Sequence, residues 1–107
     1  MNKFFSNLGL ALRAGKLVTG DDTVLDAIRS GKAKLAIMAT DASDNTTKKF
    51  RDKCTSYHVP LMQYGTREEL GASVGKAERV IMAVTDDGFA KLLRKCQANL
   101  AEVEKFE

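Results

Sequence analysis

The chain has 107 residues, of which 44% are hydrophobic, and its formal net charge is +3 at pH 7. This length predicts one domain over residues 1–107 that buries its own core, and it is too short for two domains. There is no apolar run of about 18 residues and no signal-peptide pattern, so we expect a cytoplasmic protein without a membrane partner. The basic balance permits a nucleic-acid partner but does not require one.

The first part of the chain shows helical spacing of apolar residues interrupted by glycines. This spacing predicts a helix over residues 2–14 and a short extended segment over residues 17–19. A helix of about two turns follows, with Asp21 or Asp22 expected as its N-cap. Gly31 stands where a left-handed residue ends such a helix.

Three further segments have the composition of strands. Residues 34–40 and 80–84 are almost entirely apolar without alternation, which predicts two central strands buried on both faces. Residues 59–64 predict another strand, with Pro60 at its start, where a missing amide donor does least harm.

Three more helices are expected between and after these strands, and the first two end near residues 57 and 74. Their expected amino-terminal caps are Asp44 or Asn45, then Thr66 paired with Glu69, then Thr85 or Asp86. The apolar stripe of the last helix comprises Phe89, Leu92, Leu93, Cys96, Leu100 and Val103. After Glu102 the chain is acidic and poorly apolar, so we expect it to fray.

Helices that alternate with strands at these lengths predict the α/β class. The expected architecture is a three-layer α/β/α sandwich with a small mixed four-stranded sheet. Neither a linker nor an internal repeat divides the chain.

Residues for catalysis or metal binding are scarce. His58 is the single histidine, and its place at a helix end favours a capping or solvent role. Cys54 and Cys96 are distant in sequence and both fall on apolar helical positions, which favours reduced, buried thiols over a disulfide or a metal pair. We therefore expect no catalytic site, no metal and no cofactor, and we expect that the protein is not an enzyme.

The region after Gly20 is the best candidate for RNA binding. The first amides of its helix lack partners within the helix and lie at the positive end of the helix dipole. Basic residues are expected to gather around one corner nearby, namely Arg13, Lys16, Arg29, Lys32 and Lys34. Lys48 and Lys49 instead suit a solvated helix face. Since only 7% of residues are aromatic, stacking of single strands is disfavoured, and folded RNA is the expected partner.

Short motifs along most of the chain have a common order and spacing. They are Gly15-Lys16, Gly20, Ala27-Ile28, Gly31 to Leu35, Asp41-Ala42, Val59-Pro60, Glu69 to Gly71, Gly75-Lys76 and Ala83 to Ala90. Together they resemble the kink-turn-binding ribosomal protein family, in particular its bacterial YlxQ-type members. The resemblance implies an α/β/α sandwich that binds kink-turn RNA, with ribosomal RNA and ribosomal particles as expected partners.

The resemblance also implies which residues meet the RNA. Lys16 keeps a basic residue that can meet the backbone, and the positions that would contact sheared G·A pairs and a flipped nucleotide are Gly20, Asp21, Asp22, Thr23, Asp26, Lys76, Ala77, Glu78 and Arg79. The family's usual Asn-Glu pair reads Asp22-Thr23 here, and its usual lysine reads Asp26. These acidic departures leave open a ribosome-assembly or protein-interaction adaptor that kept the fold without specific RNA reading. A small-molecule-binding domain or minor enzyme is a more remote alternative.

Overall fold

The computed structural model describes the backbone of residues 2–105 and the side chains of residues 2–97. Its elements in chain order are α1 (Lys3–Arg13), β1 (Leu17–Thr19), α2 (Asp21–Arg29), β2 (Leu35–Met38), α3 (Asp44–Ser56), β3 (Leu61–Gln63), α4 (Arg67–Ser73), β4 (Ile81–Val84) and α5 (Asp87–Lys105). The strands form one sheet in the order β1-β4-β2-β3, in which β4 is antiparallel to both neighbours and β3 is parallel to β2. The expected α/β/α sandwich is confirmed.

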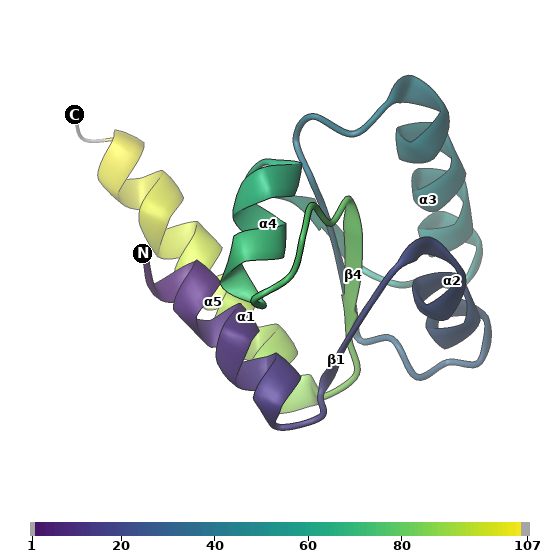
Figure 1. Cartoon of the computed structure of the whole chain (residues 1–107), viewed down its shortest axis with the longest axis horizontal. Helices are drawn as coiled ribbons and strands as arrows, with labels where there is room; N and C mark the ends of the chain where they lie inside the picture. Colours follow the sequence, from purple (N-terminus) through teal and green to yellow (C-terminus); the bar gives the residue numbers. More distant parts are fainter. Residues whose placement is uncertain (1, 106–107) are drawn as a thin grey trace.

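The sheet separates two helical layers, with α1, α4 and α5 on one face and α2 and α3 on the other (Figure 1). Because successive side chains of a strand point to opposite faces, β2 and β4 contribute to two separate hydrophobic clusters. Leu35 and Ile37 join the cluster under α1, whereas Ala36 and Met38 join the cluster under α2. Every residue of β2 and β4 is buried, as predicted for central strands.

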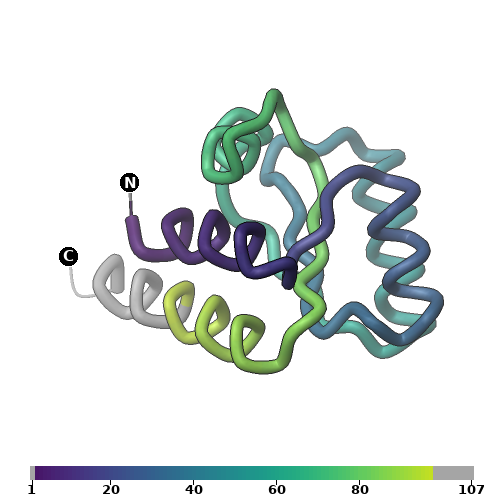
Figure 2. The backbone as a smooth tube through the Cα atoms, turned by 60° about the horizontal axis from the view of Figure 1, so that its bottom comes forward, coloured from purple at the N-terminus to yellow at the C-terminus, as the bar shows by residue number. Residues whose placement is uncertain are grey.

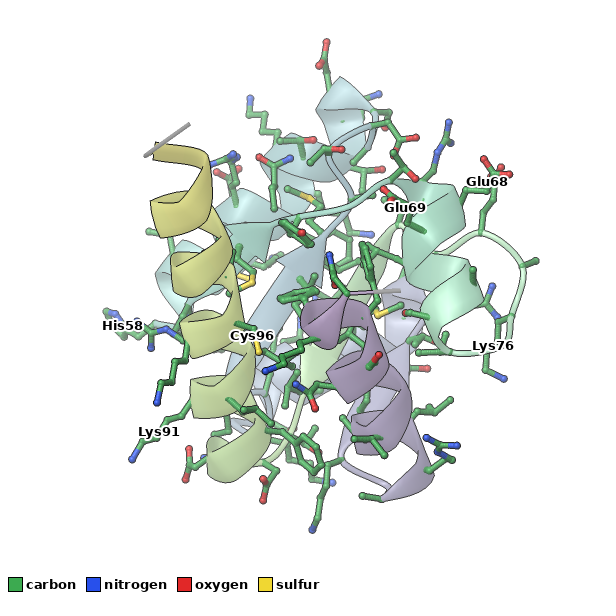
Figure 3. The ribbon with its side chains drawn as sticks, turned by 90° about the vertical axis from the view of Figure 1, so that its left-hand side faces the viewer. His58, Glu68, Glu69, Lys76, Lys91 and Cys96 are labelled. Carbon is green, nitrogen blue, oxygen red and sulfur yellow. The ribbon has the colours of Figure 1, made fainter. Side chains whose placement is uncertain are left out.

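Helices α1 and α5 run side by side on the first face (Figure 2). Cys96 lies between them, and the Asn7 amide Nδ2 donates to its Sγ at 3.5 Å (Figure 3). Leu93 is fully buried, but Leu92 is 40% exposed, so the predicted apolar stripe is wrong at Leu92. Neighbouring residues of a helix point about 100° apart, and Leu93 takes the core position. The expectations for Leu100, Val103 and the end after Glu102 lie outside the described side chains.

Side chains cap four of the helices at their amino ends. Asn2, Ser43, Thr66 and Asp86 each accept a hydrogen bond from a first-turn amide. The capping box of Thr66 and Glu69 is confirmed, and so is Asp86. For α3 the predicted cap is wrong by one or two residues: the extended backbone belongs to Ser43, which leaves Asp44 within the first turn.

Four helices end with the same backbone arrangement. Gly15, Gly31 and Gly75 each have a positive φ and are followed by a lysine. The amide of that lysine donates to the carbonyl five residues earlier, which satisfies one of the last carbonyls of the helix. His58 occupies the equivalent left-handed position after α3, with a φ of 57°. The prediction for Gly31 is confirmed, and each Gly-Lys pair of the sequence marks a helix end.

Candidate nucleic-acid interface

The amino end of α2 differs from those of the other helices. Its N-cap is Gly20, with a φ of 96°, and no side chain of the described residues accepts a hydrogen bond from its first amides. The predicted N-cap at Asp21 or Asp22 is wrong, because β1 turns directly into α2 through a conformation that glycine alone adopts easily. Asp21 and Asp22 are therefore exposed residues of the first turn. The amides of residues 21–23 remain available to acceptors outside the protein.

The segment before β4 lies against this helix start. The Arg79 side chain donates from Nε to the Thr19 hydroxyl at 3.3 Å, immediately before Gly20. The same guanidinium donates from Nη1 to the carbonyls of Glu78 at 2.9 Å and Ala77 at 3.4 Å. The structure thus brings together two segments that are far apart in sequence. We call this surface, residues 19–23 with residues 75–79, the loop end.

The backbone of the loop end rests on α4 at a glycine. A Cβ atom at Gly71 would overlap the carbonyl oxygen of Ala77 and would stand 3.1 Å from the Cα of Glu78. The backbone torsions of Gly71 are those of an ordinary helix. Glycine is required here because there is no room for a Cβ atom, and not because of an unusual φ angle. The sequence analysis included Gly71 in a motif but gave it no role at the site.

A third contact ties the loop end to the segment that follows β2. The Arg67 amide donates to Asp41 Oδ1 at 2.9 Å, and Arg67 Nε lies 3.5 Å from Asp41 Oδ2. The Arg67 carbonyl in turn accepts from the Arg79 amide at 3.1 Å. Sequence reasoning missed both Asp41 and Arg67 as site residues, although Asp41 belongs to a motif that carried the family resemblance.

The loop end carries charges of both signs. Its own exposed carboxylates are those of Asp21, Asp22 and Glu78, against the basic side chains of Lys76 and Arg79. Glu68 and Glu69 project from the beginning of α4, on the side of the molecule away from Lys91 (Figure 3). A phosphate backbone would meet repulsion at several of these positions, whereas the free amides still offer donors.

Asp26 and Thr23 lie along one side of α2. They line a hollow of about 280 Å³ that also includes Val18, Ser30 and Lys32. Asp26 is one turn from Asp22 on the same side of the helix, and it is exposed. It therefore stands between the start of α2 and the basic residues beyond its end.

The predicted basic corner lies at the opposite end of the sheet. The Lys16 carbonyl accepts from the Thr85 amide at 2.9 Å, and the Lys34 amide donates to the Val84 carbonyl at 2.7 Å. These lysines thus flank the carboxyl end of β4, whereas the loop end adjoins its beginning. We call this surface the basic edge; it comprises Lys16, Arg29, Lys32 and Lys34. Arg13, which the sequence interpretation placed in the same corner, instead lines a hollow beside the end of α4 with Val74 and Gly75.

The sequence interpretation placed Arg29, Lys32 and Lys34 beside the start of α2, and this is wrong. Nine helical residues at 1.5 Å each separate the two ends of α2 by about 13 Å. The structure therefore divides the predicted RNA-binding residues into two sets. Asp26 lies between them.

The residues considered above for catalysis or metal binding include Cys54 and His58. Cys54 is buried, and burial raises the pKa of its thiol to about 11. His58 is exposed at the end of α3. In the described part of the chain, no group of three or more His, Cys, Asp or Glu side chains could hold a metal ion. None of the helices described there has the length and apolar character needed to cross a membrane.

Comparisons with known proteins show the family to which this chain belongs. The model of the ribosomal protein L7Ae/L30e/S12e/Gadd45 family matches residues 2–94. RNA-binding protein YlxQ of Bacillus subtilis is 50% identical over 91 residues, which covers 85% of this chain and 91% of the relative. Large ribosomal subunit protein eL30 of Branchiostoma belcheri is 34% identical over 105 residues, with 92% and 88% covered.

A solved structure has the same arrangement of elements. It is a protein of unknown function from Bacillus halodurans C, with a TM-score of 0.86, 43% identity, and coverage of 90% of this chain and 97% of that one. The family match spans most of the chain, and the structural match includes both helical layers. The chain therefore belongs to the ribosomal protein L7Ae/L30e/S12e/Gadd45 family.

Proposed function

We propose that this chain binds structured RNA and recognises a kink-turn with its loop end. The observation that carries the proposal is the uncapped start of α2, where Gly20 leaves the amides of residues 21–23 open to an external acceptor. Such amides, at the positive end of a helix dipole, suit phosphate oxygens and the acceptor atoms of base edges. The RNA-binding description of the Bacillus subtilis relative supports the same class of partner.

The loop of residues 75–79 provides the second contact. Its position next to Thr19 supports a division of labour in which α2 meets the G·A pairs and the loop covers a neighbouring nucleotide. Arg79 contributes a fixed positive charge, while Asp22 can accept hydrogen bonds from the exocyclic amino groups of bases. Carboxylates at this end favour contacts to base edges over contacts to phosphates.

The test compares a kink-turn duplex with the same duplex in which Watson–Crick pairs replace the G·A pairs. We expect the kink-turn to bind at least about tenfold more tightly, or ~1.4 kcal/mol. Both affinities should fall with salt because phosphate contacts release counterions. Equal affinity for the two RNAs at every salt concentration would contradict kink-turn recognition and leave only charge attraction.

We also propose that the protein associates with ribosomal particles, as the ribosomal relatives suggest. Sedimentation of cell extract with and without mild nuclease tests this. We expect the protein to sediment with the particles and to be released when exposed RNA is cut. Retention after nuclease would favour the adaptor alternative, in which protein contacts hold it, and absence from the particles would contradict the association.

A further inference from the structure

The basic edge presents its charges on fixed backbone. Lys16 and Lys32 directly follow the left-handed glycines that end α1 and α2. Their amides donate hydrogen bonds to the carbonyls of Ala11 at 2.8 Å and Ala27 at 3.0 Å, respectively. The backbone of Lys34 is held by the hydrogen bond that its amide donates to the Val84 carbonyl at the end of β4. All three side chains are exposed. A phosphate partner would therefore meet charges whose backbone positions are already set.

None of these charges forms an ion pair with an acid among the described residues, although Asp26 lies close by. Among the described residues, Arg67 and Asp41 form the only ion pair, and it belongs to the other end of the sheet. Three acids lie nearby. Asp26 is three residues before Arg29 and lines the same hollow as Lys32. Asp86 and Asp87 begin α5, where Asp86 accepts from the Phe89 amide at 2.9 Å and Asp87 lies in the first turn. The basic edge thus keeps positive charge that no ion pair among the described residues neutralises.

Helix dipoles explain only part of this cluster. Arg29 lies in the last turn of α2, where a cation stabilises the helix. Lys16 and Lys34 instead directly precede strands, so a helix dipole does not require them. The charges of Lys16 and Lys34 therefore have no role in stabilising a helix, and a bound anionic partner would explain them.

We propose that the basic edge binds the phosphate backbone of a second RNA duplex while the loop end holds the kink-turn. This inference rests on the proposed function for the choice of RNA as partner, but it uses a different surface. Lysine is depleted in the cores of protein–protein interfaces, which disfavours a protein partner. The basic edge contains no aromatic side chain on which single-stranded bases could stack, so a duplex backbone is the matching ligand.

The geometry favours two RNA segments over one continuous track. The surfaces lie at opposite ends of β4, and the carboxylate of Asp26 lies in the hollow between them. The protein then links two RNA helices: the loop end binds the kink of one RNA, and the basic edge binds the phosphate backbone of the other.

The first experiment measures binding of an uninterrupted RNA duplex to the variant Lys16→Glu/Lys34→Glu. We expect affinity to fall at least about tenfold at low salt, and the salt slope to fall by about two phosphate contacts. The matched control is Lys48→Glu/Lys49→Glu, which changes net charge equally on exposed positions of α3. We expect the control to weaken binding by less than about threefold. An equal loss in both variants would overturn the inference.

A second variant guards against a local structural effect. Arg29→Glu/Lys32→Glu alters the same surface from α2, and it should give a similar loss while circular dichroism shows an unchanged fold. If neither variant of the basic edge weakens duplex binding, the inference is overturned. If the edge binds an acidic polypeptide such as polyglutamate as tightly as the duplex, charge alone is the attraction and RNA as its ligand is overturned.

The last experiment asks whether two RNAs are bound at once. Protein captured on an immobilised short-armed kink-turn RNA should retain a labelled duplex, and Lys16→Glu/Lys34→Glu should not. Displacement of the duplex by kink-turn RNA would show a single shared site and overturn the inference. If G·A replacement has no effect but the basic-edge variants still lose duplex binding, the proposed kink-turn recognition fails while duplex binding by the basic edge stands.

Discussion

The loop end and the basic edge differ in what fixes them. At the loop end, hydrogen bonds from Arg79 and the close fit over Gly71 set the positions of backbone groups. At the basic edge, exposed side chains of one charge sign project from helix ends and strand starts. The first arrangement suits recognition of one shape, while the second suits attraction to any phosphate backbone. The family fold can therefore carry both tasks on opposite ends of one small sheet.

Distance keeps the two ends electrostatically separate. At physiological salt the Debye length is about 8 Å, which is shorter than the roughly 13 Å length of α2. Arg29 and Lys32 therefore compensate little for Asp22 at the loop end. Any offset for the carboxylates there must come from Lys76, Arg79 and the free amides of α2.

The largest expected effect comes from Gly71→Ala, which disturbs the loop end alone. The new Cβ would overlap the Ala77 carbonyl, so the loop must shift, and we expect the free energy of unfolding to fall by about 1–3 kcal/mol. Denaturant unfolding measures this loss. Discrimination between kink-turn RNA and its G·A-replaced duplex should decrease, while binding of the plain duplex persists.

The control for Gly71→Ala is Ala72→Ser, at the adjacent exposed position of α4. It should alter neither stability nor discrimination appreciably. If Gly71→Ala leaves kink-turn discrimination intact, the loop does not take part in reading the RNA, and the loop end reduces to the start of α2.

A smaller effect is expected from Asp26→Lys, between the two surfaces. The change removes one repulsive charge and adds one attractive charge, so kink-turn binding should tighten by about 1–2 kcal/mol at modest salt. The salt slope should rise by about one phosphate contact. Titrations at two salt concentrations measure both quantities, and thermal stability should change little because Asp26 is exposed.

Asp52→Lys provides the same charge change on the exposed surface of α3. An equal gain from Asp52→Lys would show that net charge, and not position, governs binding. Unchanged affinity in Asp26→Lys would mean that this side of α2 does not face RNA, which would favour the adaptor alternative.

The smallest effect should come from His58→Gly at the end of α3. His58 has a left-handed backbone conformation that costs an L-residue free energy, so glycine should raise the stability by about 0.5–1 kcal/mol. His58→Ala keeps the strain and should give no comparable gain. Thermal unfolding compares the two variants, and neither should alter discrimination at the loop end. An equal gain in stability from His58→Ala and His58→Gly would contradict the idea that the left-handed backbone of residue 58 is strained.

The sequence was sufficient for the order of elements and for most helix boundaries. Apolar runs identified β2 and β4 as central strands, because burial on both faces removes alternation. Caps were less predictable: Asp21, Asp22 and Asp44 are good capping residues, yet each lies inside a first turn. The N-caps are Gly20 and Ser43 instead, because these residues have the non-helical backbone conformation of an N-cap. The residue types alone do not show which residue adopts that conformation.

For the candidate site, the family resemblance predicted the two segments of the loop end, but it predicted neither their contact nor their separation from the basic edge. Local spacing determined where helices begin and end, because capping and periodicity act over a few residues. Tertiary structure decided which segments meet: strand order placed Arg79 beside Thr19, and the fit over Gly71 set the loop. It also set Lys16 and Lys34 on either side of β4, far from the start of α2. These are long-range contacts, and the spacing of residues along a single chain does not specify them.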